Sequence, residues 1–441
     1  MRASRRTQSG STERKGWRPD NDPEQISLWL LPSGPDQVGE ASAHRRSPRP
    51  ISWIGTASAS RWGILPAKPG RGTGAAGGGV GANASGPSLN SGHFGSLCAA
   101  PSTMLRMVPL PGCAGRMFVV AAIVSLGHEA SMPLSAISNV FSGNPLNRVS
   151  ERRGDQAWLD GLIADPGSLA IPLWNGQPLT EKSKDGGVQL AYVPAKMGLE
   201  LAGGVWERLL FLGLWKETAV FAVDMEGGLD PCDGPLQGVG EFKDLRAVAT
   251  TLPAAEAAIT ATAKGMFEWR RKHRHCAACG EQSQVAEGGW KRVCTSCKAE
   301  HFPRTDPVVI MLATFEGKCL LGRQAIWPKG MHSALAGFLE PGETMEEACA
   351  RELMEEAALT ATKVHYHSTQ PWPYPNSLMI GLIAEVDSAD ARPDQTELES
   401  VRWFTREEAR QLINGGFDGC FAPPPLAIAH QLVKSWAEGE G

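Results

Sequence analysis

Residues 337–356 read GFLEPGETMEEACARELMEE, a loop containing glycine and proline that runs into a helix. Thr344 is suited to cap the start of this helix, with Glu347 three positions later, and this pairing predicts a helix over residues 345–359. Apolar residues recur every four positions along it and predict one buried stripe, made of Met345, Cys349, Leu353 and Ala357.

The same helix carries three carboxylates that indicate a cation site. Glu352, Glu355 and Glu356 lie within about one turn, and like charges four residues apart repel by a few tenths of a kcal/mol when exposed. A bound cation removes this repulsion, and carboxylate oxygens suit Mg²⁺ or Mn²⁺, which often bridge to substrate phosphates. The alternative is a solvated acidic helix, but that interpretation leaves the preceding loop unexplained.

Two Cys-x-x-Cys pairs precede this stretch. Fourteen residues separate the pairs, a spacing typical of a zinc ribbon in which four thiolates close a tetrahedron around a structural Zn²⁺. Disulfides or redox motifs are the alternatives. The other six cysteines show no paired spacing along the sequence, which favours zinc and a reducing cytoplasm. The predicted ligands are Cys276, Cys279, Cys294 and Cys297. The basic run before them, residues 269–275, predicts a solvated surface or a phosphate contact.

A proline-rich segment follows the acidic helix, with the sequence Thr369-Gln370-Pro371-Trp372-Pro373-Tyr374-Pro375-Asn376-Ser377. Three prolines fix φ in this short stretch and stiffen an extended loop. Rigid aromatic side chains in such a loop suit flat bases as ligands. The alternative is a turn whose aromatic residues belong to the core.

The region upstream of the cysteines predicts a domain rich in β-structure. Residues 205–215 and 218–223 read as two apolar strands around the charged turn Lys216-Glu217. An alanine-rich helix is expected over residues 253–264, leading out of this domain.

The first 130 residues differ from the rest in charge and composition. The 441-residue chain has 43 Lys and Arg against 47 Asp and Glu, a balance that excludes a basic nucleic-acid coat. Residues 1–130 hold 14 of the basic and 7 of the acidic residues, with 19 Gly, 12 Pro and 16 Ser. This composition predicts a segment that cannot bury a core. We expect an upstream extension, with the protein beginning near Met132; a disordered tail or a transit peptide is the alternative.

The loop and helix resemble the Nudix box, since Gly337, Glu343 and the run Arg351 to Glu356 stand at that motif's spacing. One position departs: Ala358 stands where the box has glycine, and a left-handed backbone there would cost on the order of 1 kcal/mol. The segment from Gln370 to Ser377 is similar to a signature of the NADH pyrophosphatase subfamily. With the cysteine pairs, these motifs identify residues from about 132 onward as a member of that subfamily.

The resemblance implies an α+β fold: a Nudix α/β/α sandwich with a mixed sheet, preceded by a zinc ribbon and the β-rich domain. The implied boundaries are 1–131 for the extension, 132–265 for the β-rich domain, 266–302 for the ribbon and 303–441 for the Nudix domain. It also implies a homodimer and no membrane association.

The resemblance further assigns roles to single residues. The Ala336 carbonyl, Glu352, Glu355, Glu356 and Glu397 would surround Mg²⁺ or Mn²⁺, with Glu356, or else Glu355, as the base. Gly337, Glu343 and Arg351 would be structural, with Arg351 pairing with Glu343 to hold the loop against the helix. The substrate contacts that it implies are Arg246, Phe302, Gln370, Pro371, Trp372, Pro373, Tyr374, Pro375, Asn376, Ser377 and Ala429.

The activity implied is hydrolysis of the pyrophosphate of NADH or NAD⁺ to (reduced) nicotinamide mononucleotide and AMP. Removal of NAD caps from RNA 5′ ends by the same scission is an alternative, and the basic residues 270–274 would be a natural contact for the RNA. A second alternative is a Nudix ligand sensor without catalysis, which the intact glutamates disfavour.

Overall fold

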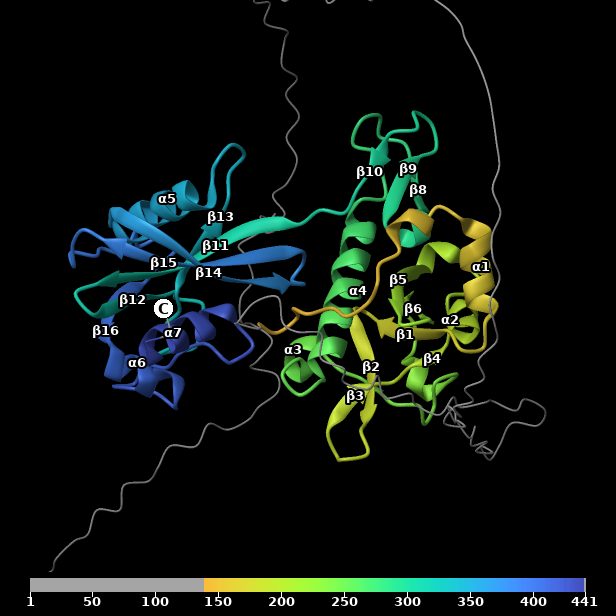
Figure 1. Ribbon diagram of the computed structural model, residues 1–441, viewed down its shortest axis with the longest axis horizontal. Coiled ribbons are helices and arrows are strands. Elements are labelled where there is room, and N and C mark those ends of the chain that lie inside the picture. Colours follow the sequence, from red (N-terminus) through yellow and green to blue (C-terminus); the bar gives the residue numbers. More distant parts are fainter. Residues whose placement is uncertain (1–138, 440–441) are drawn as a thin grey trace, which may run out of the picture. The chain divides into compact units, whose positions relative to one another are not determined.

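The computed structural model describes residues 139–439, so the expectations for residues 1–131 lie outside the described part of the chain. The upstream domain contains α1 (Gln156–Ala164), β1 (Leu169–Trp174), β2 (Gln177–Lys182), β3 (Val188–Leu190), β4 (Val193–Pro194), α2 (Ala195–Leu201), β5 (Leu209–Trp215), β6 (Thr218–Met225), β7 (Glu241–Phe242), α3 (Leu245–Val248) and α4 (Ala254–Lys272). These elements are shown in Figure 1.

The upstream sheet has the strand order β3-β2-β1-β6-β5, with β4 paired to β1 and β7 to β2. The predicted pair of apolar strands is present as the antiparallel hairpin β5–β6, while β1 runs parallel to β6. Residues 206–208, expected as strand, form a 3₁₀ turn instead. Helix α4 begins where predicted and continues to Lys272, eight residues beyond the expected end.

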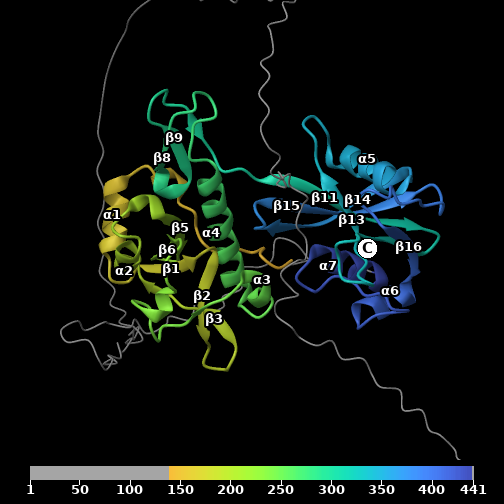
Figure 2. The same cartoon turned by 180° about the vertical axis from the view of Figure 1, so that it is seen from behind.

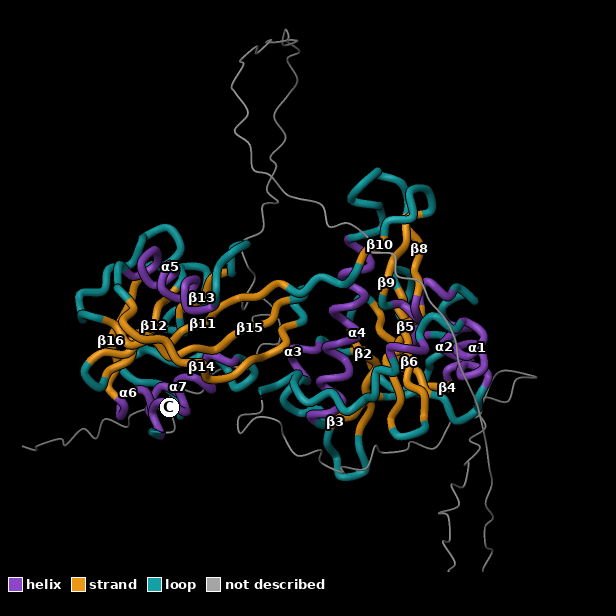
Figure 3. The backbone as a smooth tube through the Cα atoms, turned by 45° about the horizontal axis from the view of Figure 1, so that its top comes forward, coloured by secondary structure: helices purple, strands orange, loops and turns teal. Residues whose placement is uncertain are grey.

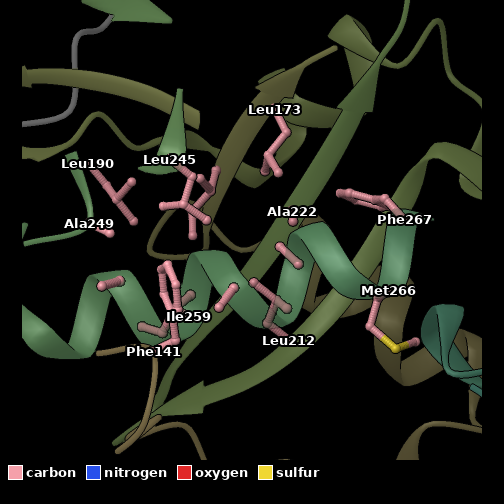
Figure 4. Close-up of a cluster of buried hydrophobic side chains, with 14 of the residues drawn as sticks. Phe141, Leu173, Leu190, Leu212, Ala222, Leu245, Ala249, Ile259, Met266 and Phe267 are labelled. Atoms are coloured by element: carbon pink, nitrogen blue, oxygen red, sulfur yellow. The ribbon is translucent and has the colours of Figure 1, made fainter. Parts of the chain in front are cut away.

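Side chains alternate between two cores on the faces of this sheet, as the pleat of a strand requires. Leu210 and Leu212 of β5 pack with Ile259 and Phe267 of α4. Figure 4 shows Ile259, Met266 and Phe267 on α4 beside Leu212 and Ala222 of the strands. Leu209 and Phe211 of β5 pack with α1 on the other face. The alanine-rich sequence of α4 therefore lies flat against the sheet.

Strand β5 ends the sheet; its outer edge pairs with Asn147 at Leu214, and two side chains from farther along the chain cover its first half. Arg270 Nη1 donates to the carbonyl of Leu209 at 2.8 Å, and Trp290 Nε1 donates to the carbonyl of Phe211 at 2.6 Å. An uncovered edge strand is a template for pairing with another chain. These two donors occupy acceptors that such a partner would use.

The remaining elements form the zinc ribbon and the Nudix domain. The ribbon has β8 (Ser283–Ala286), β9 (Lys291–Cys294) and β10 (Glu300–His301). The Nudix domain has β11 (Asp306–Phe315), β12 (Lys318–Arg323), β13 (Leu335–Phe338), α5 (Met345–Ala357), β14 (Ala361–Trp372), β15 (Ser377–Val386), β16 (Ser400–Thr405), α6 (Arg406–Ile413) and α7 (Ile428–Glu438).

The Nudix sheet is mixed and covered on both faces, which confirms the predicted sandwich. Its order is β14-β15-β11-β12-β16, with β13 paired to β11; only β11 and β15 run parallel among the pairs between these strands. Helix α5 packs on one face, and α6 and α7 pack on the other (Figures 1 and 2). Figure 3 separates these strands from the helices by colour.

None of the helices within residues 139–439 combines the length and the hydrophobicity that crossing a bilayer requires.

Candidate functional site

Helix α5 starts with the predicted capping box. Thr344 Oγ1 accepts the N–H of Glu347 at 3.2 Å, and Glu347 Oε2 accepts the N–H of Thr344 at 2.8 Å. The helix ends at Ala357, two residues before the expected end, because Ala358 adopts the left-handed conformation with φ 55°. The strained, left-handed backbone that we expected at Ala358, where the Nudix box has glycine, is therefore present.

Arg351 holds the loop before α5 against the helix, as predicted. Its guanidinium donates to both oxygens of Glu343, at 2.7 and 3.0 Å, and to the carbonyl of Phe338 at 2.9 Å. These bonds lower the pKa of the Glu343 carboxyl to about 2. Arg351 also pairs with Glu352 at 2.8 Å and Glu355 at 2.9 Å. The Glu355 carboxylate thus has a cationic partner already, which makes it the weaker candidate for the base.

Glu352 lies directly over the backbone of β13. It is buried, with 9% of its surface exposed. A Cβ atom at Gly337 would overlap the carboxylate carbon and both carboxylate oxygens of Glu352. The glycine at this position is therefore required by the close approach of the side chain to the strand, and not by its own backbone dihedrals.

Glu356 is the most buried carboxylate of the site, with 4% exposure. Burial, together with the charges of Glu352, Glu397 and Asp394, raises its pKa to about 8, which the nearby Ala336 backbone partly opposes. Its Oε2 atom is buried and has no hydrogen-bond partner. A buried oxygen without a partner, in a set of carboxylates with negative charge in excess, suits a divalent cation. The residues present therefore fit the expected metal.

Glu397 lies on the loop between β15 and β16, and its charge acts on Glu356. Asp394, which the sequence interpretation did not include, belongs to the same group because its charge also acts on Glu356. The sequence could have indicated Asp394 only through its position in a turn, three residues before Glu397. Asp side chains often accept nearby N–H groups in turns. The charges of Glu352, Glu397 and Asp394 thus all act on Glu356, which also lies beside the Ala336 backbone.

The four predicted zinc ligands converge. Their ligand atoms all lie within 4.8 Å of one another, and within the described range no other set of three or more His, Cys, Asp or Glu does so. The Cys276–Cys297 and Cys279–Cys294 sulfur distances are 3.6 and 3.5 Å. Burial opposes ionisation of Cys294, but the backbone N–H groups of Cys297 and Ser296 lower its pKa to about 6. A closed set of four thiolates is a structural zinc site.

The side chains of the proline-rich segment point mainly inward. Gln370 is 1% exposed. Its Nε2 donates to the carbonyls of Val140 and Leu426, at 3.1 and 2.8 Å, and its Oε1 accepts from Ile428 at 2.9 Å. Trp372 is 7% exposed and belongs to the core, as the alternative interpretation expected. These two side chains fix the segment and leave no free polar atom of Gln370 for a ligand.

Of the other expected substrate residues, the structure brings Arg246 and Tyr374 into contact. The Arg246 guanidinium stacks on the Tyr374 ring, 4.0 Å from its centroid. Ala429 is buried in α7, and Phe302 is 62% exposed between β10 and β11. Pro371 is exposed, while Pro373 and Ser377 are buried, and Pro375 and Asn376 lie in the turn between them.

The basic run before the ribbon is only partly the solvated surface that the sequence suggested. Arg270 is 5% exposed and bonded to β5. Lys272, Arg274 and His275 are exposed, and Arg271 and Arg274 both pair with Glu226, at 3.3 and 3.7 Å. The prediction of a solvated surface therefore holds for the end of the run, whereas Arg270 is buried where α4 packs against the sheet.

Three family models match the chain in succession. Residues 167–269 match the NADH pyrophosphatase-like rudimentary NUDIX domain, residues 271–302 the NADH pyrophosphatase zinc ribbon domain, and residues 303–419 the NUDIX domain.

Three curated relatives match between 45% and 68% of this chain. The human NAD-capped RNA hydrolase NUDT12 is 35% identical over 344 residues, covering 68% of this chain and 73% of the relative. The human mitochondrial NAD(P)H pyrophosphatase NUDT13 is 38% identical over 217 residues, covering 45% and 60%. The NAD-capped RNA hydrolase NudC of Chromobacterium violaceum is 35% identical over 224 residues, covering 51% and 78%.

Proposed function

Since the chain belongs to the NADH pyrophosphatase group of Nudix hydrolases, we propose that it hydrolyses the pyrophosphate of NADH or NAD⁺ to (reduced) nicotinamide mononucleotide and AMP. One observation carries the proposal: the Glu356 oxygen is buried without a partner, where the charges of Glu352 and Glu397 act on the same carboxyl group. The family models and relatives support hydrolysis, and the names of the relatives support the dinucleotide.

The catalytic cation is Mg²⁺ or Mn²⁺, which the Ala336 carbonyl, Glu352, Glu356 and Glu397 would hold. Such a cation supplies charge neutralisation for the pyrophosphate and activation of the attacking water. Arg351 keeps Glu352 in place through the 2.8 Å ion pair. Glu356 would also accept the proton of the water, through whichever carboxylate oxygen does not bind the cation.

The structure favours Glu356 over Glu355 as the base. Glu356 is 4% exposed, whereas the Glu355 side chain is 58% exposed and paired with Arg351. A carboxylate held by an arginine is a poorer proton acceptor than one that burial keeps basic. Glu355 therefore contributes to the charge around the site and to the position of Arg351.

The test is AMP release from NADH, from NAD⁺ and from NAD-capped RNA, each with Mg²⁺ or Mn²⁺. Glu356→Gln should lower turnover by at least about a hundredfold, as expected for loss of a general base. Glu346→Gln is the matched control, because Glu346 is an exposed glutamate in the first turn of the same helix. Near wild-type turnover in Glu356→Gln would refute the assignment of the base.

Cap removal from RNA is the second candidate, favoured by the names of two relatives. The scission and the carboxylates would be the same, and only the path of the RNA strand differs. Arg270 is buried and bonded to β5, and Arg271 and Arg274 pair with Glu226, so that only the exposed end of the basic run would be open to the RNA. Turnover of capped RNA exceeding that of free NADH across a salt series would favour this candidate.

We also propose a homodimer and a cytoplasmic location. Light scattering coupled to size-exclusion chromatography tests the assembly, and imaging of a tagged full-length chain tests the location.

A further inference from the structure

The loop of residues 390–398 is attached to the end of the catalytic helix. The N–H of Arg392 donates to the carbonyl of Ala357 at 2.9 Å, and the N–H of Asp394 donates to the carbonyl of Glu356 at 3.2 Å. Carbonyls at the end of a helix have no partner within the helix and need one from elsewhere. The loop provides two, so its position is fixed relative to the helix that bears Glu352 and Glu356.

Within this loop, the Asp394 side chain organises the backbone around Glu397. Its carboxylate accepts the N–H of Glu397, at 3.2 and 3.1 Å to the two oxygens, and the N–H of Leu398 at 3.0 Å. It also accepts the hydroxyl of Thr396. An aspartate that accepts N–H groups three and four residues ahead closes a tight turn.

The far side of the turn is anchored in the core. Leu398 is 3% exposed and packs under the sheet with Leu335 and Leu353. Glu397 therefore stands between a buried side chain and the Asp394 turn, with its own side chain exposed. The Asp394 oxygens are occupied by N–H and O–H donors of the loop, unlike Glu356 Oε2, which has no partner.

We propose that Asp394 is a positioning residue that holds Glu397 opposite Glu356 by closing the 394–398 turn and fixing it to the end of α5. It acts through Glu397 and not as a ligand of the cation. The inference rests on the proposed function, in which Glu397 is a cation ligand. Residues that orient metal ligands typically contribute about 10–100-fold to metal affinity or activity.

The test compares Asp394→Ala, Asp394→Asn and Glu397→Gln in the full-length, zinc-loaded protein. Asp390→Ala is the matched control, because Asp390 lies on the same loop and pairs only at the surface, with Arg392 at 2.5 Å and side-chain exposures of 71% and 73%. Mn²⁺ binding is measured without substrate from the electron paramagnetic resonance signal of free Mn²⁺. The kcat and KM for NADH are measured separately, and thermal unfolding reports the fold.

We expect Asp394→Ala to weaken Mn²⁺ binding about 10–100-fold, in the direction of Glu397→Gln, and to lower kcat with little change in KM. Asp394→Asn should stay close to wild type, because its amide oxygen can accept the same N–H groups. The control should bind Mn²⁺ as the wild type does.

Wild-type Mn²⁺ affinity in Asp394→Ala would overturn the proposal. So would Asp394→Asn binding as weakly as Asp394→Ala, since the charge would then act directly on the cation. If Asp394→Ala does not fold, Mn²⁺ binding by Asp394→Asn is compared with that of Glu397→Gln. Binding as weak as in Glu397→Gln would then overturn the proposal. Should Mn²⁺ binding follow the expectation while no protein, including wild type, releases AMP from NADH, the positioning role stands and the proposed function fails.

Discussion

Replacing Ala358 by glycine should make the protein more stable. Ala358 ends α5 with φ 55°, and a left-handed conformation costs a residue with a Cβ about 1–2 kcal/mol. Glycine removes this cost, but its greater freedom in the unfolded chain offsets about 0.4–1 kcal/mol. The exposed methyl group of Ala358 buries little surface, so its loss adds little. The expected net gain is about 0.5–1 kcal/mol, or roughly 1–3 °C in Tm.

The assay is thermal unfolding of the zinc-loaded protein, with the control Ala350→Gly in the interior of the same helix. Ala350 has ordinary helical geometry, so glycine there should lower stability by about 1 kcal/mol. The two identical substitutions, eight residues apart, should therefore shift Tm in opposite directions. A lower or unchanged Tm for Ala358→Gly, alongside the expected loss for Ala350→Gly, would refute the reasoning.

Three further predictions concern the glycine beneath Glu352, a buried acid and the zinc site. Gly337→Ala should reduce AMP release by about a hundredfold with little change in Tm. Glu352 must withdraw from the new Cβ atom, and a displacement of about 1 Å can lower the rate of catalysis about a hundredfold. A fully active variant would contradict this prediction. Burial raises the pKa of Glu256 from 4.5 to about 7, so stability should fall as pH rises between these values, by at most roughly 1.4 kcal/mol per unit. Denaturant titrations across this range should show the fall, and Glu256→Gln should abolish it. Cys294→Ser should lose bound zinc, measured by mass spectrometry of the metal, and lower Tm; full zinc content would count against the four-cysteine site.

The features that the sequence predicts well depend on neighbours along the chain. The capping box at Thr344, the stripe of α5 and the Arg351–Glu343 pair all join residues separated by at most one or two helical turns. The cysteine pairs work in the same way, since each pair spans a single turn. For these features, spacing and residue type are enough, because the local backbone geometry determines which side chains meet.

The features that the sequence misses depend on contacts between distant segments. Asp394 joins the site only because its loop folds back onto the end of α5. Arg270 is buried because α4 continues past its expected end and meets β5. Gln370 turns inward because Val140 and Leu426, far away in sequence, supply its partners. A propensity or a charge pattern contains no information on such pairings.

The covered edge of β5 has a consequence for how the protein is made. Strand β5 leaves the ribosome well before Arg270 and Trp290, whose side chains close its edge. Until those residues emerge, the carbonyls of Leu209 and Phe211 on the nascent upstream domain have neither donor, and such an edge can pair with other nascent chains. Trp290 lies in the segment that matches the zinc ribbon model, and small zinc domains commonly fold only with the metal bound. We therefore expect zinc starvation during synthesis to prolong the exposure of this edge and to favour aggregation of the protein.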